Sequence, residues 1–147
     1  MTRLILFVAL FCFVNAAETN PPPEFYDHDV KQLMAAEIVR FDSMSVPFGQ
    51  HDGNAAFREI LKKENFLRCF VTVFNYGNPQ ACCYALIALR EISPFYFREC
   101  MARFRKSAPK TVKTYSDVYV PNSDAKKLLD DIESGAYRWY FERSEKG

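Results

Sequence analysis

The cysteines are the side chains of this sequence with the most recognisable chemistry. A nucleophilic thiolate would require Cys82 or Cys83 to be activated by a histidine, and the chain has only His28 and His51. Cys82 falls just inside an expected helix N-terminus, where a thiolate gains some stabilisation. No CxxC pair occurs, so a thioredoxin-like redox site has no support. A cysteine-dependent enzyme is therefore only an alternative hypothesis.

The same cysteines are also candidates for a disulfide. If the segments on either side of Gly77 are antiparallel helices, Cys69 comes level with Cys82 and Cys83, and a bridge to either is geometrically possible. Cys100 would lie beside a position near residue 87 of the helix that holds Cys82 and Cys83, so it is poorly placed to reach either cysteine. The alternative, that all four are small buried hydrophobic residues, is slightly favoured.

Metal and hydrolytic chemistry have little support in the sequence. His28 and His51 lie in different segments, and neither belongs to a ligand motif such as HExxH. The aspartates beside His28 are typical of a solvated helix start. Asp130 and Asp131 are neighbours on a helix surface, so their carboxylates diverge and do not face each other as glycosidase acids must. We predict no metal ion, no cofactor and no enzyme activity.

The charge distribution provides a first candidate binding surface. Residues 98–116 hold six basic residues and one acid, whereas residues 17–64 hold nine acids and five bases. Such a cluster can meet an acidic partner, but a solvated helix end that complements its own dipole is the favoured explanation. This basic strip consists of Arg98, Arg103, Arg105, Lys106, Lys110 and Lys113.

The second candidate surface is an aromatic tail near the C-terminus. Tyr137, Arg138, Trp139 and Tyr140 follow one another, and Phe141 comes next. Aromatic residues and arginine are enriched at interface hot spots. Packing of the tail back onto the core is an equally good explanation.

The N-terminus has the pattern of a secretory signal peptide. Arg3 precedes an unbroken apolar run from Leu4 to Val14, and small residues then precede a predicted cut after Ala16. The run is too short to span a bilayer, which takes about 20 apolar residues. Cleavage would leave equal numbers of acidic and basic residues and four cysteines in an oxidising compartment. We therefore expect a secreted or periplasmic protein, and no nucleic-acid partner.

The composition predicts a folded, mainly helical chain. Hydrophobic residues make up 49%, aromatic residues 16% and charged residues 25%, with a formal net charge of +1, which excludes a disordered chain. Apolar periodicity predicts a mainly α, small single domain of about five helices over 26–141. A Pro-rich leader at 17–25 precedes it and a charged tail at 142–147 follows. The clearest helices are 79–92 and 94–106, each begun by a capping residue and a proline.

Three other segments are less regular. Residues 26–42 show helical spacing of apolar side chains. Residues 65–74 fit either a helix or a strand, because a short apolar run with β-branched and aromatic residues is ambiguous. Residues 110–120 alternate and are rich in Val, Thr and Tyr, which predicts a short extended segment.

The helical pair over 77–106 resembles one unit of a HEAT-type repeat. The features that carry the resemblance are a proline-started helix, its small-residue and leucine pattern, and a tight Ser93-Pro94 step into a second helix. The resemblance implies an antiparallel helical hairpin and a partner-binding rather than catalytic role.

These observations favour an exported, non-enzymatic interaction protein of inhibitor or immunity type. It would present the basic strip or the aromatic tail to a protein partner. The alternatives are the cysteine-dependent enzyme and a small-ligand carrier with a cavity in its aromatic-rich core.

Overall fold

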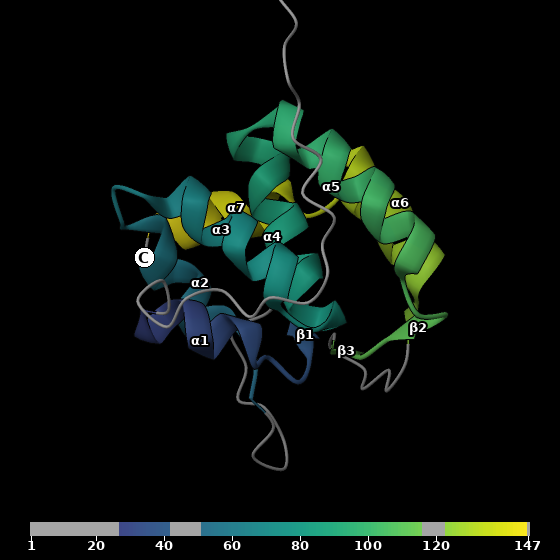
Figure 1. The fold of residues 1–147 in the computed structure, drawn as a ribbon, viewed down its shortest axis with the longest axis horizontal. Coiled ribbons are helices and arrows are strands. Elements are labelled where there is room, and N and C mark those ends of the chain that lie inside the picture. The colour runs from purple at the N-terminus through teal and green to yellow at the C-terminus, as the bar shows by residue number, and fades with distance from the viewer. Residues whose placement is uncertain (1–26, 42–50, 116–122, 147) are drawn as a thin grey trace, which may run out of the picture.

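Helix α4 occupies the centre of the molecule, and the other helices surround it (Figure 1). The computed structural model describes residues 27–41, 51–115 and 123–146, so the predicted signal peptide (1–16) and leader (17–25) lie outside the described residues. This part of the chain contains seven helices, two more than expected: α1 (His28–Met34), α2 (Asn54–Leu61), α3 (Phe66–Tyr76), α4 (Pro79–Ile92), α5 (Pro94–Ser107), α6 (Ala125–Ser134) and α7 (Arg138–Glu145).

The central position of α4 follows from its composition. Every residue from Ala81 to Leu89 is buried, which requires neighbours on all sides of the helix. Asn78 caps the helix by accepting a hydrogen bond from Ala81 N at 2.9 Å, and Pro79 occupies its first turn, as predicted. The apolar stripe that the sequence predicts is therefore only part of the buried surface.

Helices α3 and α5 pack on either side of α4 (Figure 1). The segment that fitted both a helix and a strand is helix α3, with Cys69, Phe70, Val73 and Phe74 buried. Helix α5 follows α4 after a single residue, Ser93, and forms the predicted hairpin. The mainly α, small single-domain fold is confirmed, because one continuous hydrophobic core joins all seven helices.

The predicted helix over 26–42 is wrong in its second half. Helix α1 ends at Met34, and the chain turns so that Glu37 N donates to His51 O at 2.8 Å. Ile38 and Val39 are β-branched and buried, and they continue as a short strand against α4 rather than as a helix.

Four strands of two residues each tie the connecting segments together. One pair is parallel, with Val39 opposite Thr114, and the other is antiparallel, with Thr111 opposite Asp124. The expected extended segment near 110–120 supplies two of these strands, while 116–122 lies outside the described residues. The strands are β1 (Val39–Arg40), β2 (Thr111–Val112), β3 (Thr114–Tyr115) and β4 (Ser123–Asp124).

The C-terminal segment is a helix and not a charged tail that begins after residue 141. Helix α6 ends at Gly135, which adopts a left-handed conformation with φ of 87°. Helix α7 then runs to Glu145 and packs on α2 and α4, with Ser144 buried. Gly135 therefore separates α6 from α7.

Candidate functional site

The four described cysteines are free, buried thiols. Cys82 Sγ donates to Phe74 O at 3.3 Å, and Cys69 Sγ donates to Asn65 Oδ1 at 3.6 Å. The predicted bridge from Cys69 to Cys82 or Cys83 is therefore absent from the structure. The thiols behave as the small buried residues of the favoured alternative.

Burial also makes these thiols poor nucleophiles. Desolvation raises the pKa of Cys82 to about 12 and the pKa of Cys100 to about 11. Burial likewise raises the pKa of Cys69 and of the fully enclosed Cys83. Cys100 also contributes to the raised pKa of Cys82.

The histidines do not assist the cysteines. His51 Nε2 lies 2.8 Å from Gln32 O and links α1 to the segment before α2. His28 is exposed in the first turn of α1. The structure therefore does not bring Cys82 or Cys83 together with a histidine that could act as a general base.

The acidic residues at the start of α1 form an ion cluster with a lysine. Lys63 Nζ lies 2.8 Å from Asp29 Oδ2 and 3.3 Å from Asp27 Oδ2. Burial acts to raise the pKa of Asp27, but hydrogen bonds from Val30 N and Lys63 lower it below its ordinary value. The Lys63 ammonium occupies the position that a cation would take. Within the described ranges, no group of three or more His, Cys, Asp or Glu side chains could hold a metal ion.

The basic strip does not form one continuous surface. The Arg103 guanidinium lies over the Phe74 ring of α3, 5.4 Å from its centroid. Arg105 points to the opposite neighbour, where its Nη2 lies 2.8 Å from Asp130 Oδ1 and 2.6 Å from a Glu133 carboxylate oxygen of α6. Because the strip winds around α5, two of its six cations are engaged within the protein.

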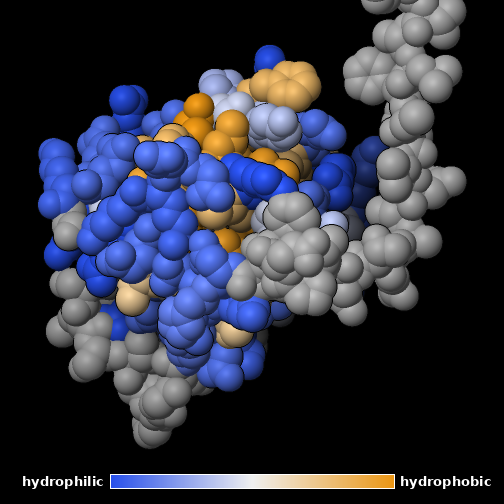
Figure 2. Space-filling model, turned by 60° about the vertical axis from the view of Figure 1, so that its left-hand side comes forward, coloured by the Kyte–Doolittle hydropathy of each residue, from blue (hydrophilic) through white to orange (hydrophobic). Residues whose placement is uncertain are grey.

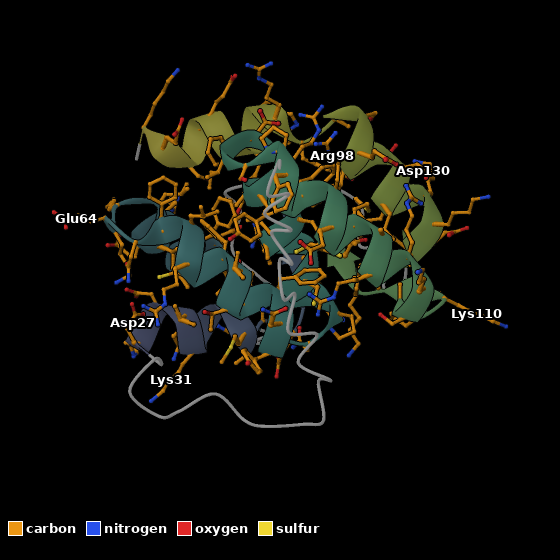
Figure 3. All side chains as sticks on the ribbon, turned by 45° about the horizontal axis from the view of Figure 1, so that its top comes forward. Asp27, Lys31, Glu64, Arg98, Lys110 and Asp130 are labelled. Atoms are coloured by element: carbon orange, nitrogen blue, oxygen red, sulfur yellow. The ribbon has the colours of Figure 1, made fainter. Side chains whose placement is uncertain are left out.

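The other four cations of the strip are exposed. Arg98 and Lys110 lie near opposite ends of the strip and are well separated, and Lys110 points away from the molecule (Figure 3). Lys106 is exposed on α5, and Lys113 is exposed between β2 and β3, where its carbonyl accepts a hydrogen bond from Val39 N. Basic residues that are close together in the sequence are therefore separate charges on the folded protein.

The aromatic tail is also divided between the core and the surface. The Tyr137 ring stacks on Phe41 with centroids 4.1 Å apart, and Tyr140 and Phe141 are buried. Trp139 and Arg138 are exposed. Each of the two explanations that the sequence left open thus applies to part of the tail.

A buried hydrogen-bond network fixes α7 and the residues it exposes. The Tyr140 hydroxyl donates to Asn54 Oδ1 at 2.6 Å, and the Tyr84 hydroxyl lies 3.4 Å from the same oxygen. The Tyr84 hydroxyl also accepts from Arg40 N at 2.8 Å. This network joins β1, α2, α4 and α7, so the first turn of α7 has a defined position.

Phe95 and Tyr96 are exposed at the start of α5, and Trp139 is exposed at the start of α7. Phe95 is 65% exposed and contacts Tyr96 edge to face, and Trp139 is 48% exposed and contacts the buried Tyr140 in the same geometry. Arg138 Nε lies 3.7 Å from Glu91 Oε2, which places the start of α7 beside the end of α4. We call Phe95, Tyr96, Arg138 and Trp139 the aromatic end. Figure 2 shows hydrophobic side chains exposed near the top of the molecule, where the α4–α5 junction lies in Figure 1.

Phe95 is an apolar residue that lies on the surface. It lies two residues before the buried Phe97, and residues two apart on a helix point roughly 200° away from each other. The two rings cannot both face the core. Helical spacing alone could therefore have identified one of them as exposed.

Comparisons with protein-family models, with curated proteins and with solved structures find no match to this chain. In the three described ranges, no helix has both the length and the apolar character that crossing a bilayer requires.

Proposed function

We propose that this protein is an exported, non-enzymatic interaction domain that binds a protein partner through its aromatic end. Three aromatic rings and an arginine on neighbouring helix ends include tryptophan, tyrosine and arginine, the residue types that dominate interface hot spots. The main support for this proposal is the exposure of Phe95. This side chain is 65% exposed, so its burial in a partner would contribute substantially to the free energy of binding.

The order of the aromatic end also supports a binding role. Trp139 rests edge to face on the buried Tyr140, and Arg138 is fixed by Glu91 and by Glu142 at 3.0 Å. Rings that are already positioned lose little conformational entropy on binding. An inhibitor or immunity-type protein, which must bind one exported enzyme tightly, is the specific form of this proposal.

The cysteine chemistry makes the enzyme alternative weaker. A catalytic cysteine needs an accessible thiol with a lowered pKa, whereas burial raises the pKa of each of these four. The hollow between β2, β4 and α6 has no aromatic side chain among its described lining residues, so it gives no support to a carrier with a ligand cavity among the aromatic side chains. The proposal that the protein is exported rests on the signal-peptide pattern of residues 1–16. The resemblance of residues 77–106 to a HEAT-type repeat stays a prediction.

Affinity capture from the source cells tests the proposal. The wild-type protein should retain one stoichiometric partner, and F95S/W139S should lose most of it. Y76S is the matched control, because Tyr76 is 47% exposed at the other end of α4, about 21 Å away along the helix. Equal retention by all three proteins, or no stoichiometric partner of the wild type, would contradict the proposal.

A further inference from the structure

A second surface lies at the opposite end of α5, where the chain passes through β2 and returns through β4 into α6. An open hollow of about 820 Å³ lies between these elements. Its apolar lining includes Ala108, Ala125 and Leu129, and three basic side chains, Arg105, Lys110 and Lys126, stand around it. The hollow is therefore an apolar depression with a basic rim.

The rim keeps two positive charges that nothing in the described chain neutralises. Arg105 is held by two carboxylates of α6, but Lys110 and Lys126 have no ion partner among the described residues. The one acid of the lining, Asp124, uses its carboxylate to cap α6, with Oδ1 2.8 Å from Lys126 N and 3.3 Å from Lys127 N.

The nearby acids of α6 contact cations other than Lys110 and Lys126, including Arg105 of the rim. Asp130 and Glu133 contact Arg105, and Asp131 Oδ2 lies 3.1 Å from Lys127 Nζ. In Figure 3 the Lys110 side chain extends into solvent beyond the end of α5, with Asp130 on the adjoining helix. A ligand that brings its own carboxylates would therefore find Lys110 and Lys126 available.

We propose that this hollow binds a short acidic peptide segment of a partner protein, with carboxylates on Lys110 and Lys126 and an apolar side chain over Ala108 and Pro109. Charge complementarity selects the sign of the ligand. A single-stranded nucleic acid fits less well, because none of the described residues that line the hollow offers an aromatic ring for base stacking. An anionic membrane also fits less well, because a flat surface cannot reach a concave apolar floor. This proposal is independent of the aromatic end.

Fluorescence anisotropy with a labelled decapeptide of six glutamates, two leucines and two glycines tests the proposal. The wild-type protein should bind it, and the counterpart with lysine in place of glutamate should not bind. K110E/K126E should weaken binding by at least about tenfold. K62E/K146E changes the net charge equally at exposed positions outside the hollow and should change binding less than about twofold. Thermal unfolding of each variant establishes that it is folded.

Three results would overturn the proposal. The first is absence of peptide binding by the wild type. The second is equal weakening by the two double variants, which would indicate a general charge effect. The third is that a single-stranded oligonucleotide or phosphatidylserine vesicles bind more tightly than the acidic peptide and that K110E/K126E abolishes this binding. That result would assign the hollow to another polyanion.

Discussion

Tyr84 is the buried side chain whose hydroxyl group connects most elements. It accepts from Arg40 N and lies 3.1 Å from Arg40 O, to which it can donate. Y84F removes this hydroxyl and with it the two hydrogen bonds to the Arg40 backbone, so we expect the free energy of unfolding to fall by about 1–3 kcal/mol. Urea denaturation measures the change. Y76F, at an exposed tyrosine, should change stability by less than about 0.5 kcal/mol, and equal effects would contradict this role of Tyr84.

The buried thiols lead to a prediction about reactivity. The experiment uses a C12S background, so that a retained N-terminus adds no thiol. Ellman's reagent should react slowly with the folded protein, and after unfolding without reductant it should detect four thiols. A fast-reacting thiol in the folded state would support the cysteine enzyme instead. Two missing thiols after unfolding would establish a disulfide.

The contact between α1 and α2 depends on pH through the Lys63 ion cluster. Because the folded state lowers the pKa of Asp27 below its ordinary value of 3.8, this carboxylate stabilises the fold above that pH, and the contribution is lost as the pH falls through the lowered pKa. K63M should therefore cost about 0.5–1 kcal/mol at pH 7 and progressively less in acid.

Denaturation curves across this pH range, with K62M as the control, measure the effect. Lys62 contacts Glu59 at 3.0 Å with both side chains 53% exposed, so K62M should have a smaller effect. A K63M effect that persists unchanged below the pKa of Asp27 would show that the carboxylate is not its source.

Helix starts were more predictable from the sequence than the packing around the helices. The capping residue and the proline that begin α4 predicted a boundary that the structure confirms, because caps act locally. The buried sides of α4 beyond its first stripe, and the turn from α1 into β1, depend on neighbours distant in the chain. A local pattern does not contain those neighbours.

The candidate surfaces were predictable only in part for the same reason. The sequence identified Trp139 and Lys110, but it grouped Arg103 with Arg105, which α5 directs toward different helices. Lys126 was missed, because its place beside Lys110 arises from the pairing of β2 with β4. Sites assembled from several elements require the fold.

At the scale of the whole molecule, the aromatic end and the basic hollow lie at opposite ends of α5. Helix α5 has 14 residues and spans about 21 Å. One partner could contact both surfaces only by extending along this helix. The described helices pack around α4 in one hydrophobic core, and this core holds the two surfaces in place.

The central claim is that the aromatic end contacts a protein partner, and site-specific photocrosslinking tests it most directly. A photoreactive phenylalanine analogue at position 95 or 139, in the protein produced by its source cells, should give one discrete crosslinked species. The same analogue at position 76, which is about equally exposed, should give none. Identical products from all three positions, or no product from 95 and 139, would contradict the account.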